Sequence, residues 1–211
     1  MAIYHFSVKI IKRSEGRSAV AAAAYRSGTK LTNEYDGITH DYTKKNWIEH
    51  SEIFLPVQAQ KCFGERSTLW NSVESIEKSG NAQLAREFEV ALPIELSPEE
   101  RYHLVQEFIQ KNLVEHGMCV DLAIHNPPLT NGFHVPIDKD GNPTTDKEAM
   151  IFQNPHAHIM TTMRPLDADG KWMDKYEKSY LCRKDNEELA IPSSKIREAE
   201  AEGWQKQYRY F

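Results

Sequence analysis

Three histidines are spaced so that they could share one metal ion. His156 and His158 are two residues apart, so on a strand both would point to one face, about 6.6 Å apart along it. His125 ends an earlier apolar segment, and an adjacent strand would lie about 4.8 Å away. Three neutral imidazoles can hold a cation and leave positions on it open, as in catalytic sites. We predict this metal site; the alternative is that His156 and His158 are ordinary surface residues of a strand.

Two carboxylates could support these histidines. Glu87 and Glu89 alternate with apolar residues, so they would share one face of a strand. Carboxylates beside a metal site often accept hydrogen bonds from the ring N–H groups of the ligands and so orient them. The alternative is ordinary surface charge next to Arg86.

A tyrosine lies on an alanine-rich segment that predicts a helix over residues 18–27. Ser18 is a suitable N-cap and Gly28 a suitable residue just past the C-terminus. Residues 18, 21, 22 and 25 would share one face, where small side chains let another backbone approach Tyr25 closely. Without further information, a tyrosine on an alanine-rich helix is more often a packed core residue, and that interpretation of Tyr25 is the alternative.

The elements that would position these residues follow from periodicity. Four segments alternate apolar and polar residues with period two, which predicts half-buried strands over residues 4–10, 87–92, 120–125 and 156–164. Their opposite faces gather histidines and carboxylates, while the apolar faces would pack on helices. Further helices are predicted over residues 64–78, 97–114 and 193–207, the second opening with a capping box at Ser97. This order predicts an α+β fold with a central, mostly antiparallel sheet flanked by helices.

The longest irregular segment runs from Asn126 to Asn154. Within it, residues 138–142 (Asp-Lys-Asp-Gly-Asn) resemble a calcium loop superficially. The glycine is at the wrong position and the distal glutamate is missing, so a hairpin turn is the better interpretation.

The composition sets broad limits. A chain of 211 residues with 40% hydrophobic content predicts one globular domain, which we expect to be the N-terminal part of a longer protein. No apolar stretch is long enough to span a bilayer and no secretory leader is evident, so we expect a cytoplasmic protein without membrane insertion. Three scattered cysteines argue against a disulfide framework and against a cysteine-based zinc site.

Positive charge is concentrated near the N-terminus. The net charge is −5, but residues 1–30 hold six cations and one anion, which makes them +5 and the rest of the chain −10. A local basic patch can bind phosphate on an acidic protein. Arg17, Arg26 and Lys30 are therefore predicted to contact DNA phosphates near Tyr25; the alternative is a solvated surface.

Several segments together resemble the MobA/MobL relaxases, a family that includes the nicking domain of TraA proteins. The matching segments run in order through most of the chain: residues 1–9, 16–28, 39–45, 86–93, 123–125 and 154–159. The spacer between His125 and His156 is longer than in shorter family members, and the resemblance is weak beyond Arg164.

The resemblance implies a histidine–hydrophobe–histidine (HUH) nuclease fold that uses Mn²⁺ or Mg²⁺. Its catalytic tyrosine falls on Tyr25, and its metal ligands fall on His125, His156 and His158. The implied substrate is single-stranded DNA at a plasmid or transposon origin of transfer, nicked through a 5′-phosphotyrosine that can be religated. Other mobilisation or coupling proteins would be partners.

Two alternatives stay open at this point. A rolling-circle replication initiator would share the fold and chemistry, and a non-catalytic DNA-binding module could keep the metal for structure. Spacing also leaves other tyrosines as nucleophiles, namely Tyr4, Tyr35 and Tyr42.

Overall fold

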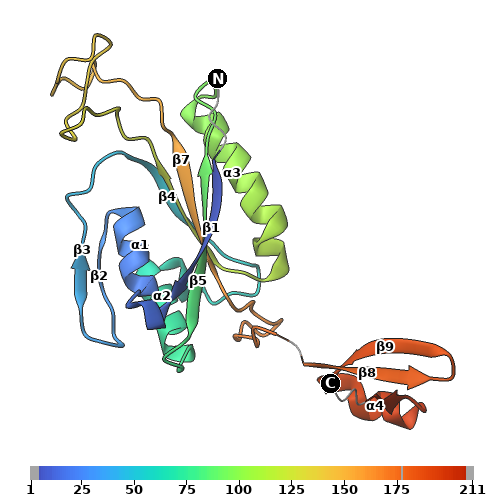
Figure 1. Ribbon diagram of the computed structural model, residues 1–211. Coiled ribbons are helices and arrows are strands. Elements are labelled where there is room, and N and C mark those ends of the chain that lie inside the picture. Colours follow the sequence, from blue (N-terminus) through green and yellow to red (C-terminus); the bar gives the residue numbers. More distant parts are fainter. Residues whose placement is uncertain (1–4, 177, 208–211) are drawn as a thin grey trace. The chain divides into compact units, whose positions relative to one another are not determined.

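The computed structural model describes residues 5–176 and 178–207 and divides the chain into two compact units (Figure 1). These units are Met1–Met173 and Asp174–Phe211. The sequence predicted one relaxase domain over residues 1–211; that both units act as one domain stays a prediction. Every residue singled out above as a candidate for the site falls in the first unit, and of these only Tyr4 is outside the described residues.

A five-stranded antiparallel sheet forms the centre of the first unit and confirms the predicted α+β class. Its spatial order is β1-β5-β7-β6-β4. The strands are β1 (Phe6–Lys12), β4 (Ile48–Phe54), β5 (Gln83–Ala91), β6 (Val120–His125) and β7 (His156–Thr162). The four predicted strands are present. The edge strand β4 was missed, because its middle residues His50, Ser51 and Glu52 are all polar and hide the alternation.

The two faces of the sheet pack on different helices (Figure 1). The apolar face carries residues such as Leu122 and Ile159 and packs against α3 (Pro98–Asn112). The opposite face packs against α1 (Ala19–Ser27) and α2 (Arg66–Ile76) through residues such as Met160. The apolar face packs on a helix as predicted, whereas the packing of α1 and α2 on the opposite face, which carries the polar positions, was not predicted.

The ends of α1 and α3 follow from their capping residues. The Ser18 hydroxyl accepts a hydrogen bond from the Ala21 backbone N–H at 3.2 Å, which satisfies one unpaired donor of the first turn. Gly28 ends α1 in the left-handed region at φ 65°, where a side chain would be strained. Ser97 and Glu100 form the expected capping box of α3.

Short elements complete the first unit. They are the hairpin of β2 (Lys30–Thr32) and β3 (Thr39–Asp41), and the 3-10 turns η1 (Arg13–Glu15), η2 (Lys61–Gly64) and η3 (Val114–His116). The three-residue strands were not predicted, because they are too short for any periodicity. Helix α2 is shorter than predicted, because η2 precedes it and the chain leaves the helix after Ile76.

The segment between β6 and β7 projects beyond the end of the sheet (Figure 1). Isolated bridges such as Pro128↔Phe152 and Ile137↔Pro143 hold its arms together. The Asp138 carboxylate accepts hydrogen bonds from the backbone N–H groups of Asp140 and Asn142, both at 2.9 Å. This carboxylate closes a turn, so the predicted hairpin turn is confirmed.

The second unit is a small sheet with one helix. It contains β8 (Ser179–Lys184), β9 (Glu187–Pro192), η4 (Ser193–Lys195), α4 (Ile196–Ala201) and β10 (Gln205–Lys206). Its core consists of Cys182, Ile191, Ile196 and Ala199. The predicted helix over residues 193–207 was too long, because η4 precedes it and the chain returns to the sheet as β10.

Two expectations from composition can be compared with the structure. Cys62, Cys119 and Cys182 are all free thiols. In the part of the chain that the structure describes, no helix combines the length and the apolar composition that crossing a bilayer requires.

Candidate metal centre

The sheet brings His125, His156 and His158 together on one face. His125 on β6 is directly opposite His156 on β7, and His158 is opposite Ala123. The ring centroids are 5.5 Å apart for His125 and His156, 4.8 Å for His125 and His158, and 5.0 Å for His156 and His158. Each residue offers one nitrogen, and these nitrogens lie within 4.8 Å of one another. A single cation could therefore be held by all three.

The outer nitrogen of each ring is already engaged by an oxygen atom. His125 Nε2 donates to the Arg26 carbonyl at 2.6 Å, and His156 Nδ1 donates to the Asn154 carbonyl at 2.8 Å. His158 Nδ1 donates to the Glu87 carboxylate at 2.9 Å. Because these acceptors need a proton on the facing nitrogen, the opposite nitrogen of each ring keeps its lone pair. Three imidazole nitrogens with free lone pairs are a suitable set of ligands for a divalent metal ion.

Burial keeps the histidines neutral. Desolvation lowers the pKa of His125 from its ordinary 6.5 to about 3, and desolvation also lowers the pKa of His156. Neutral imidazole is the form that binds metal, so protons compete weakly at these two residues.

Glu87 links the metal centre to helix α1. Its carboxylate is 1% exposed, accepts the His158 hydrogen bond, and binds the Arg26 guanidinium through both carboxylate oxygens. Burial by itself would raise the pKa of Glu87, but the hydrogen bonds from His158 and Arg26 outweigh it and lower the pKa to about 2. Glu87 therefore stays ionised and accepts a hydrogen bond that orients the His158 ring.

Arg26 makes its contacts inside the protein, and its contact with DNA phosphate stays a prediction. Its side chain is 14% exposed, and besides binding Glu87 it donates to the Ala22 carbonyl at 3.0 Å. Its own carbonyl accepts the His125 hydrogen bond. Arg26 thus supplies one of the three histidine acceptors, its own carbonyl, and binds a second acceptor, Glu87, with both arms of its guanidinium.

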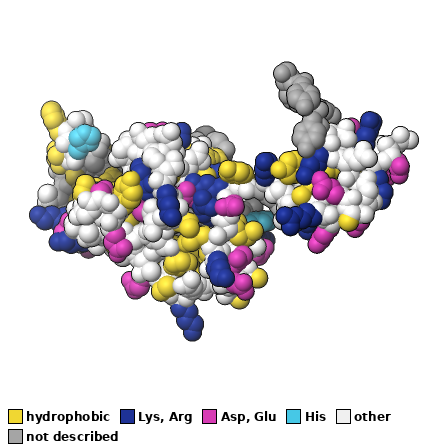
Figure 2. Space-filling view, turned by 90° about the horizontal axis from the view of Figure 1, so that it is seen from below, with side chains coloured by type: hydrophobic (Ala, Val, Ile, Leu, Met, Phe, Trp, Pro, Cys, Tyr) yellow, Lys and Arg dark blue, Asp and Glu magenta, His cyan; other side chains and the backbone are white. Residues whose placement is uncertain are grey.

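Arg17 and Lys30 remain on the surface. The Arg17 side chain is 38% exposed, and the Lys30 side chain is 60% exposed with Asp41 at 3.3 Å. Arg17 precedes the N-cap of α1 and Lys30 follows its C-terminus, so Lys30 is nearer in sequence to Tyr25, which lies in the last turn. On the face drawn in Figure 2, Lys and Arg side chains are interspersed with Asp and Glu rather than gathered in one block.

Tyr25 lies in the last turn of α1 and is 48% exposed, so it is not a packed core residue. The Lys45 ammonium donates to the Tyr25 carbonyl at 2.9 Å and lies 3.6 Å from the centre of its ring. Tyr42 packs edge-on against the same ring at 5.2 Å. These contacts hold the tyrosine in place beside Arg26, whose carbonyl binds His125.

Lys45 is a residue that the sequence reasoning did not single out, although it ends the matching segment at residues 39–45. Burial and the nearby Arg26 charge lower the pKa of Lys45 to about 8. Its position in a segment that matches the family could have drawn attention to Lys45. Its contact with Tyr25 could not be predicted, because the two residues are 20 positions apart in the sequence.

Glu89 does not contact the three histidines through any hydrogen bond seen among the described residues. It accepts a hydrogen bond from Lys9 at 2.7 Å and lies 3.7 Å from His5. Of the two carboxylates considered from the sequence, the structure places Glu87 against a histidine ring and Glu89 at a neighbouring pocket.

The sheet and the histidine cluster define an α+β protein with a three-histidine candidate metal centre beside a partly exposed tyrosine. Residues 17–210 match the model of the MobA/MobL family, so the chain belongs to this family.

Among curated relatives, the chain is 37% identical to the "Conjugal transfer protein TraA" of Agrobacterium fabrum over 180 residues. It is 39% identical to the "Mobilization protein MobL" of Acidithiobacillus ferridurans over 172 residues. Each match covers 81% of this chain, but 14% of TraA and 45% of MobL. The chain therefore spans less than half the length of either relative.

A solved structure is also similar to this chain. It is described as "Molecular Basis of Vancomycin Resistance Transfer in Staphylococcus aureus" and has 31% sequence identity and a TM-score of 0.66. The match covers 95% of this chain and 86% of that chain. The similarity extends over nearly the whole fold and agrees with the membership of a mobilisation family.

Proposed function

We propose that this chain is the relaxase part of a DNA mobilisation protein, and that it nicks single-stranded DNA at an origin of transfer. The observation that carries the proposal is the connection between Tyr25 and the histidine cluster. Arg26 follows Tyr25 directly and contacts His125 through its carbonyl and Glu87 through its side chain. A nucleophile and a candidate metal centre are thus joined by consecutive residues of one helix.

In the proposed reaction, the Tyr25 hydroxyl oxygen attacks the scissile phosphorus and forms a 5′-phosphotyrosine. The bond from phosphorus to the 3′-oxygen breaks, and that oxygen leaves as a 3′-hydroxyl after taking a proton. The phenol proton is released when the new bond forms. One phosphodiester replaces another, so the reverse attack by a 3′-hydroxyl can reseal the strand.

His125, His156 and His158 would hold a divalent cation, for which Mn²⁺ and Mg²⁺ are our candidates. When bound, such an ion polarises the phosphate and offsets the charge that develops on its oxygens. Glu87 and the two carbonyl acceptors keep the rings oriented, while Lys45 and Tyr42 hold the Tyr25 ring. The site would work on DNA in the cytoplasm, with other mobilisation proteins as partners.

The test is capture of a covalent adduct. The wild-type chain, Mn²⁺ and a labelled single strand from the origin of the element that encodes it should give a denaturation-resistant adduct on the downstream fragment. Tyr25→Phe removes the attacking oxygen and keeps the ring, so the adduct should disappear while DNA binding persists. Tyr35→Phe is the matched control, because Tyr35 is also exposed, at 59%.

Each other outcome excludes a defined part of the proposal. A nucleotide mapped to Tyr42 would refute the assignment of the residue but keep the mechanism. Cleavage that releases a free 5′-phosphate would refute the tyrosine mechanism. Binding of the oligonucleotide without cleavage would favour a non-catalytic DNA-binding module, whereas cleavage at a replication origin would favour a replication initiator.

A further inference from the structure

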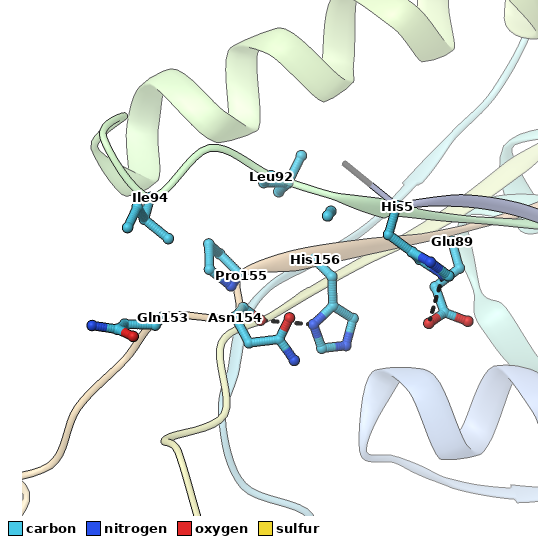
Figure 3. Close-up of a pocket in the computed structure, with 9 residues that line it drawn as sticks. His5, Glu89, Leu92, Ile94, Gln153, Asn154, Pro155 and His156 are labelled. Carbon is cyan, nitrogen blue, oxygen red and sulfur yellow. Dashed lines mark hydrogen bonds and ion pairs between the residues drawn. The ribbon is translucent and has the colours of Figure 1, made fainter. Parts of the chain in front are cut away.

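A pocket of about 230 Å³ lies beside the histidine cluster (Figure 3). His156 forms part of its wall, so the pocket and the candidate metal centre share one side chain. His5, which directly precedes β1, and Glu89 on β5 line one side of the pocket. The segment after β5 and the segment before β7 supply the remaining walls, through Leu92, Ile94, Gln153, Asn154 and Pro155.

The pocket combines apolar surfaces with polar groups at its edge. Leu92 is 5% exposed, Pro155 is buried, and Ile94 presents more of its side chain at 42% exposure. Around them are the Glu89 carboxylate, the His5 imidazole and the side-chain amides of Gln153 and Asn154. A flat apolar ligand with hydrogen-bonding groups along its edge fits this combination.

The charge of the pocket argues against a second phosphate site. The hydrogen bond from Lys9 is the first cause of a lowered pKa at Glu89, so this carboxylate is ionised at neutral pH. Among the residues that line the pocket there is no lysine or arginine. Lys9 is already paired with Glu89 at 2.7 Å and the pocket lining adds no lysine or arginine, so an anion would find no surplus positive charge there, whereas a neutral ring needs none.

We propose that this pocket binds the base of the nucleotide whose phosphate lies at the histidine cluster. The inference rests on the proposed function, since it takes a nucleic acid as the ligand. His156 forms the wall that the two sites share, so a nucleotide could place its phosphate on one side and its base on the other. Leu92, Ile94 and Pro155 would contact the faces of the base.

The same pocket would select among bases. A carboxylate accepts hydrogen bonds and cannot donate them when ionised, so Glu89 favours a base that presents an exocyclic amino group. Cytosine, adenine and guanine carry one, whereas the ring donor of thymine, N3–H, lies between two carbonyl oxygens that a carboxylate would repel. The pocket therefore takes an amino-bearing base and discriminates against thymine.

The experiment monitors base binding without requiring cleavage. The ¹⁵N-labelled chain is loaded with Mg²⁺, and the side-chain amide signals of Gln153 and Asn154 are followed by NMR during titration with dCMP, dTMP or 2-deoxyribose 5-phosphate. We expect saturable shifts with dCMP. Affinity for dTMP should be roughly fivefold or more weaker, as expected for one lost edge contact. The sugar phosphate, which lacks a base, should leave both amide signals in place.

Glu89→Gln keeps the shape of the side chain and replaces the acceptor carboxylate by an amide that also donates. In this variant the preference for dCMP over dTMP should fall to about twofold or less, with metal affinity unchanged. Glu99→Gln is the matched control, because Glu99 is an exposed carboxylate on α3, at 85% exposure, away from the pocket.

Two results would overturn the inference. If the sugar phosphate shifts the amides as dCMP does, the base does not enter the pocket. If wild-type protein binds dCMP and dTMP equally, Glu89 does not read the base edge. Both results could occur while Tyr25 still forms its adduct, so they are distinguishable from failure of the proposed function.

Discussion

His125 and Arg26 are joined by a hydrogen bond of 2.6 Å from the imidazole Nε2 to the backbone carbonyl oxygen. This contact ties the end of β6 to the last turn of α1. Because Tyr25 precedes Arg26, any movement of α1 along the sheet would displace the tyrosine and one candidate ligand together. The position of Tyr25 relative to the three histidines is therefore set by this contact and by the Arg26–Glu87 pair.

Replacement of His156 should abolish specific metal binding. His156→Ala removes one of three nitrogen donors, so we expect the affinity for Mn²⁺ and for Zn²⁺ to fall by about 100-fold or more. The wild-type chain should bind Zn²⁺ more tightly than Mn²⁺. Isothermal calorimetry measures both affinity and stoichiometry. His103→Ala is the control, because His103 is exposed on α3. Unchanged stoichiometry in His156→Ala would exclude the three-histidine site.

Replacement of Glu87 should weaken metal binding without removing a ligand. Glu87→Gln leaves His158 with a neutral acceptor and Arg26 without its carboxylate, so we expect metal affinity to fall about 10- to 100-fold. Glu89→Gln changes a carboxylate two residues away and should leave metal affinity unaltered. Equal effects of the two variants in calorimetry would show that general negative charge, rather than the contact with His158, supports the site.

The metal-free protein should lose stability as the pH falls from about 6.5. The pKa of His125 is about 3 in the folded chain and ordinarily 6.5, so between these values the unfolded chain binds more protons than the folded chain. The free energy of unfolding therefore decreases as pH decreases through this range. Glu87, with a folded pKa of about 2, adds to the loss below its ordinary 4.5.

Urea unfolding between pH 7 and pH 4.5 measures the histidine contribution, because Glu87 contributes little there. His125→Asn should flatten the dependence of unfolding free energy on pH in this range. If wild-type and variant have parallel curves, His125 is not the group that titrates.

Surface cations and Arg26 should behave differently toward DNA. Arg17→Ala and Lys30→Ala should each lower the slope of log affinity against log salt for single-stranded DNA by roughly 0.7, if each contacts one phosphate. Arg26→Ala should leave that slope unchanged and weaken metal binding instead, since its guanidinium binds Glu87. Fluorescence anisotropy from 50 to 300 mM salt gives the slopes. A reduced slope for Arg26→Ala alone would reverse this assignment.

Loss of the Lys45 ammonium should slow adduct formation more than DNA binding. It contacts both the ring and the carbonyl of Tyr25, and interactions of this kind correspond to roughly a 3- to 30-fold effect. Lys45→Met should therefore reduce the single-turnover rate by about tenfold with a small change in Kd. Lys45→Arg should restore part of the rate, because it keeps the cation. Lys44→Met, which changes the adjacent exposed lysine, is the control.

The strand pattern predicted the histidine site because period two determines which side chains share a face. It could not predict that His125 would be opposite His156, since register depends on pairing between strands that are distant in sequence. The contact of Arg26 with Glu87 could not be predicted for a related reason. Glu87 is 61 residues from Arg26 in the sequence, and only the packing of β5 beneath α1 brings the two side chains into contact.

Polar sequences account for the missed elements. Strand β4 has few apolar residues, and β8 and β9 in the second unit contain many charged ones, so none gives the expected alternation. The contact of Lys45 with Tyr25 depends on the folding of a short hairpin onto α1. Such contacts between small elements leave no periodic signal.

The long segment that separates His125 from His156 has a consequence for how such proteins can diversify. The two histidines are paired across adjacent strands, so the sheet holds them together and the intervening chain does not set their separation. Residues can be inserted, deleted or exchanged between Asn126 and Asn154 with both ring positions preserved. A chain with this architecture could thus acquire a different segment here in a single recombination step and keep the same histidine cluster, so the segment and the cluster can evolve independently.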